Sequence, residues 1–365
     1  MKNIFKIILF LAAIFSAQLV FSCTDIEVVA KDGSRIIART MEFTLDLKSN
    51  ILTRQRGFTF KTEAPFSKPG LNWQTKYGYV YFNALNKDFT VDGLNEKGLA
   101  FEYLYLPGLT QYQEVPTDKA NQALPYYQFG DWVLSNFATV EEVKNALQDV
   151  YIFEQKINGL GNMVFPLHAA IHDKKGNGIV VEFIKGKVNV YDYAGVMTNA
   201  PTYDWQLANL GQYLNLAPFN PKPIVLNGVS YAANGEGSGM LGLPGDVSPP
   251  SRFVKMATMV KSAFQVDNAA QAVNLAEHII NNVDIPAGFV RSKANNKVQF
   301  ETTEWTVFKD LTNLKLYYHT YNDTNLKVID LNKIDFSKDS KPLILHLGVK
   351  PIIPDVTSNF RPVKT

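Results

Sequence analysis

The hydrophobic pattern of this 365-residue chain begins with one long apolar run and then changes to short alternating segments. Residues 7–20 are almost wholly apolar, follow two lysines, and end in small residues at the −3 and −1 positions before Cys23, which is typical of a cleaved signal peptide. The run is shorter than the ~20 apolar residues of a membrane span. We therefore predict that residues 1–22 are removed and that residues 23–365 form one exported domain.

Alternation of apolar and polar positions downstream predicts many short strands. The first two, Cys23–Lys31 and Ser34–Phe43, flank Asp32-Gly33, a two-residue turn signal, and are expected to form a hairpin. The other predicted strands are Tyr77–Leu85, Leu99–Leu104, His168–His172, Ile179–Ile184, Lys187–Tyr193, Thr303–Asp310, Lys315–Thr320 and Leu326–Asp330.

The predicted turn also sets the register of this first hairpin. Pairing Lys31 with Ser34 places Cys23 directly opposite Glu42. Strict alternation then puts Arg39 on the other face from Cys23, so Arg39 is expected to reach that residue only through a bulge or bend.

Four segments carry apolar residues at helical spacing. The first begins with a proline, whose missing N–H costs nothing at the opening position of a helix. The second begins with Thr139 and Glu142 in the spacing of a capping box. Strands early, helices in the middle and strands again later predict α+β layers rather than regular βαβ alternation. The predicted helices are Pro125–Asn136, Val140–Val150, Ser251–Phe264 and Ala269–Val283.

Composition narrows the classes of partner. The net charge is +2 with acidic and basic residues interspersed, which gives no support to nucleic acid or an acidic membrane as a partner. Aromatic residues make up 12% of the chain, which suits extensive β-sheet and an apolar ligand pocket. The only cysteine is Cys23, so no internal disulfide forms and this thiol is either dispensable or chemically useful.

The position of Cys23 suggests its chemistry. Cleavage before it leaves a thiol and a free α-amino group on one residue, so nucleophile and base occur together. The thiol titrates near ~8.5 and an α-amine near ~7.7–8.0, so the amine is able to accept the thiol proton without a histidine.

A different class of protein also places a cysteine at the end of a signal peptide. In a lipoprotein, Cys23 would carry a diacylglycerol group, its amine would be blocked, and the chain would be a surface-anchored ligand-binding protein with an inert hydrolase fold. Val20 and Phe21 fit a lipoprotein signal poorly. The mass of the mature amino terminus distinguishes the two interpretations.

Five separated segments carry a family resemblance. They are Cys23-Thr24, Arg39-Thr40-Met41-Glu42, Asp92-Gly93-Leu94-Asn95-Glu96-Lys97-Gly98-Leu99, Val196-Met197-Thr198-Asn199-Ala200-Pro201-Thr202-Tyr203-Asp204-Trp205, and Gly239-Met240-Leu241-Gly242-Leu243-Pro244-Gly245-Asp246 running into Ser248-Pro249-Pro250-Ser251-Arg252-Phe253. In this order they resemble the motifs of the choloylglycine hydrolase family, which comprises bile salt hydrolases and penicillin V acylases. The similarity extends over essentially the whole of residues 23–365, which the resemblance makes one catalytic domain.

The resemblance implies a fold and a reaction. The fold is the α+β, four-layer αββα sandwich of the N-terminal nucleophile hydrolases, in which two stacked antiparallel sheets lie between helix layers. The reaction is hydrolysis of a linear, non-peptide amide by the Cys23 thiol, and no metal or organic cofactor is required.

The resemblance also assigns roles to three residues that would otherwise have ordinary explanations. Arg39 and Arg252 are expected to place two cations near the Cys23 thiol and to lower its pKa, although an isolated arginine is usually a surface charge or an ion-pair partner. Asn199 is expected to donate its side-chain amide to a developing oxyanion, although an isolated Asn-Ala-Pro is usually a turn.

Two further positions are assigned by the resemblance and depart from its commonest pattern. Glu42 stands where relatives typically carry Asp, and is expected to orient the α-amine of Cys23. Tyr105 stands where bile salt hydrolases often have Asn and penicillin V acylases often have Tyr, and its main-chain N–H is expected to be the second oxyanion donor.

The implied partner is a small-molecule amide with a bulky apolar acyl group. Glycine- or taurine-conjugated bile acids are the first expectation; penicillin V and acyl-homoserine lactones are the alternatives. The segment 242–246 resembles the assembly loop of bile salt hydrolases and implies a homotetramer. His168 and His172 have metal-ligand spacing, but a plain strand with one outward histidine is the preferred interpretation over zinc.

Overall fold

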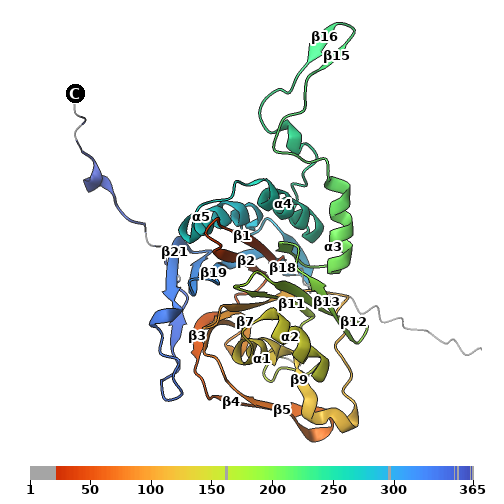
Figure 1. The fold of residues 1–365 in the computed structure, drawn as a ribbon, viewed down its shortest axis with the longest axis vertical. Coiled ribbons are helices and arrows are strands. Elements are labelled where there is room, and N and C mark those ends of the chain that lie inside the picture. Colours follow the sequence, from red (N-terminus) through yellow and green to blue (C-terminus); the bar gives the residue numbers. More distant parts are fainter. Residues whose placement is uncertain are drawn as a thin grey trace, which may run out of the picture.

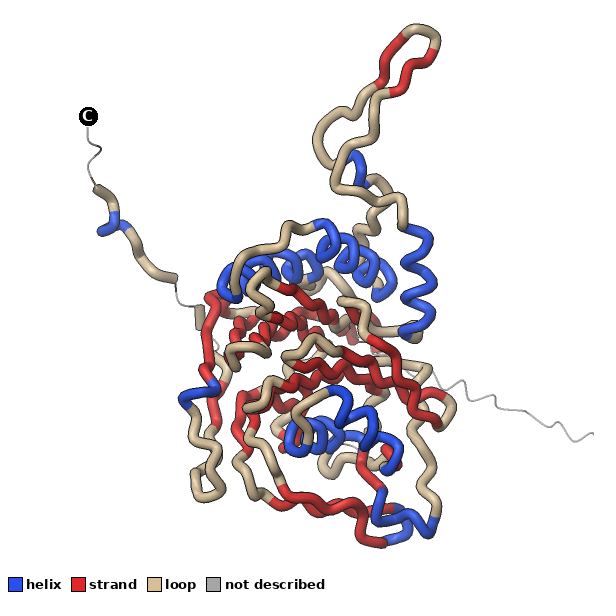
Figure 2. Tube along the Cα trace, viewed as in Figure 1, coloured by secondary structure: helices blue, strands red, loops and turns tan. Residues whose placement is uncertain are grey.

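A computed structural model describes residues 22–160, 163–294, 297–348, 350–351, 353–361 and 363. Of the predicted signal peptide, only Ser22 lies within these ranges. Two large antiparallel sheets are stacked face to face, with helices on the outer face of each (Figures 1 and 2). This arrangement confirms the predicted α+β, four-layer αββα sandwich.

The first sheet has six strands and contains the amino-terminal hairpin. All of its neighbouring strands are antiparallel. Its strands, in spatial order, are β14 (Val196–Met197), β1 (Thr24–Val29), β2 (Arg35–Phe43), β19 (Thr302–Asp310), β20 (Lys315–Thr320) and β21 (Asp323–Asp330).

The second sheet has eight strands and is antiparallel throughout. A strand near the carboxyl end of the chain pairs with β3 and forms one edge of this sheet. Its strands, in spatial order, are β13 (Lys187–Asp192), β12 (Gly178–Ile184), β11 (Leu167–Asp173), β8 (Leu99–Tyr105), β7 (Lys87–Asn95), β6 (Tyr79–Ala84), β3 (Asn50–Arg54) and β22 (Ile344–His346).

Helices cover the two outer faces. Helices α4 (Pro249–Ser262) and α5 (Ala269–Ile280) pack on β1 and β2, while α1 (Phe129–Asn136) and α2 (Val140–Ala146) pack on the eight-stranded sheet (Figure 1). Helix α3 (Tyr203–Leu210) packs beside α4. None of the helices in the described ranges combines the length and hydrophobicity that a membrane span requires.

In the described part of the chain, four short two-stranded ribbons lie outside the two sheets. The ribbon after α3 projects away from the body of the molecule (Figure 1) and exposes its apolar side chains to solvent. The ribbons pair β4 (Thr59–Ala64) with β5 (Lys68–Gln74), β9 (Ala123–Pro125) with β10 (Tyr151–Phe153), β15 (Ile224–Leu226) with β16 (Val229–Tyr231), and β17 (Arg291–Ala294) with β18 (Lys297–Phe300).

The predicted register of the first hairpin is wrong by one residue. The observed pairs include Thr24 with Thr40 and Asp25 with Arg39, because the loop has three residues and not two. The Ala30 N–H donates to the Ser34 carbonyl at 2.9 Å across this loop. Gly33 closes it with a φ of +86°, as the left-handed position of a three-residue hairpin requires.

A one-residue shift moves every side chain of a strand to the opposite face. Cys23 and Asp25 alternate onto one face of β1, so the observed pairing puts Arg39 on the same face as Cys23. The bulge expected between Cys23 and Arg39 is therefore unnecessary. Glu42 does not stand opposite Cys23, because the observed register brings Met41 to that position.

Helix starts were predicted with mixed success. The Glu142 N–H donates to the Thr139 hydroxyl at 3.3 Å, which confirms the cap at the start of α2. Pro125 does not open a helix; it ends β9, a 3₁₀ turn follows at Tyr126–Gln128, and α1 begins at Phe129. The short parallel pairing of β9 with β10 takes Pro125 into a strand.

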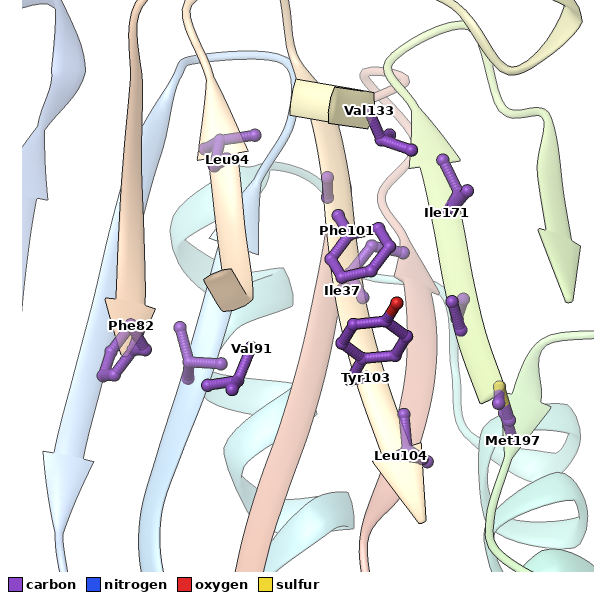
Figure 3. Packing of buried hydrophobic residues seen from close by; sticks show 14 of the residues in the cluster. Ile37, Phe82, Val91, Leu94, Phe101, Tyr103, Leu104, Val133, Ile171 and Met197 are labelled. Atoms are coloured by element: carbon purple, nitrogen blue, oxygen red, sulfur yellow. The ribbon is translucent and has the colours of Figure 1, made fainter. Parts of the chain in front are cut away.

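The hydrophobic core fills both the space between the sheets and the space under the helices. In Figure 3, Phe101 and Leu94 lie with Val133 of α1, while Ile37 and Met197 come from the other sheet. All five side chains are fully buried, so both sheets and their helices belong to one continuous core.

Candidate active site

The Cys23 thiol is buried between the two sheets at the start of β1. Only 3% of the residue is exposed. Its sulfur lies 3.5 Å from Nη2 of Arg39 and 3.9 Å from Sδ of Met41, both on the adjacent strand β2. The sequence motif and the hairpin thus bring the predicted nucleophile and the first predicted arginine into contact.

Arg39 is fixed from several directions. Its Nη2 donates to the Tyr103 carbonyl of the opposite sheet at 2.7 Å, and its Nη1 lies 3.7 Å from an Asp92 carboxylate oxygen. The guanidinium also lies over the Trp305 ring, 4.8 Å from the ring centre. A fully buried cation held in this way has a fixed position relative to the sulfur.

Arg39 and Arg252 each act to lower the pKa of the Cys23 thiol, as expected, but the net shift of this pKa is upward. Burial raises the pKa of the Cys23 thiol and outweighs the opposing effects of Arg39 and Arg252. A thiol with a raised pKa keeps its proton at neutral pH, so a base would have to remove that proton in any reaction in which the thiol is the nucleophile.

Arg252 of α4 approaches Cys23 from its main-chain side. Its Nη1 donates to the Cys23 carbonyl at 2.6 Å and to the Thr24 hydroxyl, and its Nη2 donates to Oδ1 of Asn199 at 2.8 Å. Asn199 in turn donates through Nδ2 to the Tyr105 carbonyl at 2.8 Å. The structure thus joins the second arginine and both predicted oxyanion residues in one chain of hydrogen bonds.

This chain fixes the orientation of the Asn199 amide. Its oxygen is held by Arg252, so its NH₂ group faces Tyr105 at the end of β8. One N–H is used by the Tyr105 carbonyl, and an amide NH₂ has a second. Burial raises the pKa of the Tyr105 phenol to about 12, so this side chain is uncharged at neutral pH.

Glu42 is fully buried with its carboxylate already hydrogen-bonded. Oε2 accepts from the Thr40 hydroxyl at 3.0 Å, and Oε1 accepts from Thr303 of β19 at 2.8 Å. Burial raises the pKa of Glu42 to about 8, although Arg252 opposes this shift. The Glu42 main chain also hydrogen-bonds the Cys23 sulfur, so the residue contacts Cys23 through its backbone.

An apolar cavity adjoins the Cys23 sulfur. Its volume is about 60 Å³, well below the ~300 Å³ of pockets that enclose drug-sized ligands, so a bulky acyl group needs the lining side chains to move or extends beyond the cavity. The lining residues are Cys23, Arg39, Met41, Glu42, Phe43, Leu47, Ala84, Leu85, Phe89, Val91, Tyr103, Leu104, Tyr105, Phe165 and Leu167.

A buried ionic network lies behind Arg39, and sequence reasoning missed it. Lys309 of β19 donates to both oxygens of Asp92 and to Oε2 of Glu102, each at 2.9 Å, and all three side chains are fully buried. Asp92 also contacts Arg39, so the network is continuous with the site. Asp92 stands in a quoted motif, but its partner Lys309 is distant in sequence and carries no local signal.

The network ends at a histidine that was interpreted differently from sequence. His172 Nε2 lies 3.3 Å from Glu102 and 3.6 Å from Asp25. Although burial opposes the charge, these carboxylates raise the pKa of His172 to about 10. His168 contacts Glu182 at 3.2 Å, and both histidines are buried, so the expectation of one outward histidine is wrong. Residues four apart in a strand share a face, and that spacing was available in the sequence.

Asp25, Glu102 and His172 could also be considered as metal ligands, since their ligand atoms lie within 4.8 Å of one another. A protonated His172 and the nearby Lys309 supply positive charge at this point. Burial raises the pKa of Asp25 to about 7 and that of Asp92 to about 6, so these two acids carry less than full negative charge beside Glu102, and Arg39 adds a further cation. This charge balance needs no additional cation, so we describe the cluster as an ion-pair network.

Lys309→Met is expected to destabilise the protein by about 3–5 kcal/mol, because it leaves Asp92 and Glu102 buried without their shared cation. Denaturant unfolding measures this loss. Lys333→Met is the matched control, since Lys333 is 82% exposed and pairs with Asp330 only at 3.7 Å, and its stability should equal that of the parent. Equal stability of Lys309→Met would show that the network contributes nothing.

Comparisons with known proteins agree with the fold. A family model described as linear amide C–N hydrolases, choloylglycine hydrolase family, matches residues 23–346. The chain is 35% identical over 318 residues to a bile salt hydrolase/transferase of Clostridium perfringens, covering 85% of this chain and 93% of that protein.

Solved structures give the same result. A mutant of conjugated bile acid hydrolase from Clostridium perfringens matches with a TM-score of 0.80 at 32% identity, over 92% of this chain and 100% of the other. Penicillin V acylase from Agrobacterium tumefaciens matches with a TM-score of 0.71 at 26% identity, over 89% and 92% of the two chains. The fold and the matches define an amidohydrolase with the N-terminal nucleophile hydrolase fold. The chain belongs to the choloylglycine hydrolase family.

Proposed function

We propose that this protein is an exported enzyme that hydrolyses conjugated bile salts, with Cys23 as an amino-terminal nucleophile once residues 1–22 are removed. The observation that carries the proposal is the buried Cys23 thiol, which adjoins an apolar cavity, contacts Arg39, and is linked through Arg252 to Asn199. The family match beginning at Cys23 supports the same starting residue.

In the first half of the proposed reaction, the α-amine of Cys23 removes the thiol proton and the sulfur attacks the amide carbonyl. The resulting oxyanion accepts hydrogen bonds from the second N–H of Asn199 and from the Tyr105 main-chain N–H. The protonated amine then gives its proton to the leaving nitrogen, the C–N bond breaks, and a thioester on Cys23 remains.

In the second half, water replaces the leaving amine. The α-amine takes a proton from this water as its oxygen attacks the thioester carbonyl, and the C–S bond then breaks to release the free acid. Arg39 stays beside the sulfur throughout and stabilises the thiolate in each half. Glu42 is assigned to orient the amine.

Bile salts are preferred as substrates because the relatives with the highest identity given above act, by name, on bile salts or conjugated bile acids. The apolar lining suits a steroid acyl group, provided that the cavity widens on binding. The test is one activity panel with glycine- and taurine-conjugated bile acids, penicillin V and acyl-homoserine lactones. Hydrolysis of the latter two but not of the bile acids would overturn this assignment.

Penicillin V acylase activity is the second candidate. Tyr105 supports it, because this position often carries Tyr in that branch of the family. Its ring lines the cavity together with Phe165, and an aromatic wall suits a phenoxyacetyl group. The same activity panel distinguishes it from the first candidate.

Assembly as a homotetramer is proposed from the resemblance of residues 242–246 to an assembly loop. The segment between α3 and α4 that includes the β15–β16 ribbon supports this proposal, since it exposes Phe219, Val225 and Leu241 at 81%, 66% and 84%. Light scattering on the purified protein measures the mass directly, and a monomer at working concentrations would exclude the tetramer.

Asn199→Ala is expected to lower kcat by on the order of 10²–10³ with a smaller effect on KM, because the oxyanion exists only in the transition state. Steady-state kinetics on glycocholate measure both constants. Asn145→Ala is a suitable control, since this asparagine on α2 is exposed and its side chain hydrogen-bonds the nearby Glu141. An effect of Asn199→Ala confined to KM would assign Asn199 to substrate binding.

A further inference from the structure

A second buried carboxylate, Glu301, lies beside the residue that precedes Cys23. Glu301 stands directly before β19 and is 1% exposed. Its Oε2 accepts a hydrogen bond from the Ser22 hydroxyl at 2.9 Å, and the Ser22 main chain is a further hydrogen-bond partner. Its other oxygen, Oε1, has no hydrogen-bond partner among the described residues.

Processing before Cys23 would remove every partner that Ser22 supplies. A buried carboxylate that loses its hydrogen bonds pays a desolvation cost that only a new donor or a proton can offset. The same cut creates a new donor nearby, because the Cys23 nitrogen is only three covalent bonds from the Ser22 nitrogen. The amino group produced by processing therefore appears next to the carboxylate that processing leaves unsatisfied.

The negative charge of Glu301 also favours the new amino group of Cys23 as its partner. Arg252 is the cation that faces Glu301, but it also interacts with Glu42, the Cys23 thiol and Asp246. Burial raises the pKa of Glu301 to about 7 in spite of Ser22 and Arg252, so its negative charge is under-compensated while the chain is intact. An α-ammonium group at Cys23 would supply the missing positive charge.

We propose that Glu301 is a positioning residue that receives the new α-amino group of Cys23 by hydrogen bond and holds it beside the thiol. This inference rests on the proposed function, since it requires Cys23 to be the amino-terminal residue. Glu42 has both carboxylate oxygens engaged by threonines, whereas Glu301 has its partners on the residue that is lost. Glu301 therefore joins Glu42 in orienting the amine, as the carboxylate whose own partner is lost on processing.

The test uses chains that begin at Cys23, produced as Met-Cys23 with the methionine removed and the amino terminus verified by mass spectrometry. Glu301→Ala should lower kcat on glycocholate by roughly 10²-fold, because the amine loses its fixed orientation. Glu301→Gln keeps a hydrogen-bond acceptor, so its kcat should fall less than that of Glu301→Ala. Glu304→Gln is the matched control: Glu304 lies on β19, three residues after Glu301, and burial likewise raises its pKa to about 7, but its charged neighbour is Asp46.

The pH profile separates positioning from a merely structural role. An ionised Glu301 favours the ammonium form of the amine and so raises its pKa; removal of the charge in Glu301→Gln lowers that pKa. The acidic limb of kcat/KM should move to lower pH by about one unit or more. The pH dependence of the rate at which iodoacetamide inactivates Cys23 should shift in the same direction, which gives a readout independent of turnover. Glu304→Gln should show neither shift.

Parental kcat and an unchanged pH profile in both Glu301 variants would overturn the inference while leaving the proposed function intact. If Glu301→Ala fails to fold, the pH profile of Glu301→Gln decides alone. If the parent chain that begins at Cys23 hydrolyses no substrate of the panel, or if Cys23→Ala retains activity, the proposed function fails and this inference fails with it.

Discussion

Replacing Cys23 with alanine or serine is expected to reduce hydrolysis by at least ~10³-fold while the protein remains folded. Alanine removes the nucleophile. Serine keeps its size but has a far less acidic group, and the thiol pKa is already raised by burial, so the same amine is unable to ionise a hydroxyl comparably. The measurement is kcat/KM on a conjugated bile acid, together with the melting temperature of each variant.

The surroundings of Cys23 indicate that these substitutions leave the fold intact. The sulfur contacts Met41 and Arg39, but the guanidinium of Arg39 retains the Tyr103 carbonyl and Asp92 as partners. Met41→Leu is the matched control, because it changes the packing against the sulfur and keeps the nucleophile. Activity near the parental level in Cys23→Ala would show that another group carries the reaction.

Retaining one residue before Cys23 is expected to remove activity altogether. A peptide nitrogen has no basic lone pair, so in a chain that begins at Ser22 the thiol keeps its proton. Ser22 also donates a hydrogen bond to Glu301 and is 2% exposed, so the folded protein holds this serine in place. Two preparations that differ by this single residue are verified by mass spectrometry and compared on the same substrate. The chain that begins at Cys23 should show full turnover, and the chain that begins at Ser22 should show none that is detectable.

The control for this comparison is structural. Both chains should show the same melting behaviour, because Arg252 binds the Cys23 carbonyl and Thr24 in a way that does not depend on the residue before them. Full turnover by the chain that begins at Ser22 would contradict the role of the α-amine, even if Cys23 remained essential.

Much of the site could be predicted because its residues stand in recognisable motifs. Arg39, Asn199, Arg252 and Tyr105 all join the hydrogen-bonded surroundings of Cys23, although they come from four separate elements or loops. The class of fold followed from the same resemblance, and the strand predictions located most of both sheets.

The hairpin register could not be read from its turn because contacts from a distant segment act on it. The Lys31 N–H donates to the Val266 carbonyl, the Asp32 N–H donates to Asp267, and the Lys31 ammonium pairs with the Asp267 carboxylate at 2.7 Å. These contacts accompany a three-residue loop, while Asp-Gly by itself favours two residues. The face of every β2 side chain depends on that difference.

Local sequence patterns also could not predict the net effect of charge and burial on the pKa of the Cys23 thiol. The two arginines lie where the resemblance puts them, yet the thiol pKa rises, because burial is a property of the whole assembled core. The partners of Asp92 illustrate the same point, since Arg39 and Lys309 stand on strands that meet only in the folded sheet.

If residues 1–22 are removed as proposed, burial of the bond between Ser22 and Cys23 sets the order of cleavage and folding. These residues are 2% and 3% exposed, whereas a peptidase needs an extended and accessible segment in its cleft. An external peptidase therefore has to cut before this region folds, because a precursor that folds first is no longer cleaved. The yield of active protein then depends on a competition between cleavage and folding, and a faster-folding variant would give less enzyme.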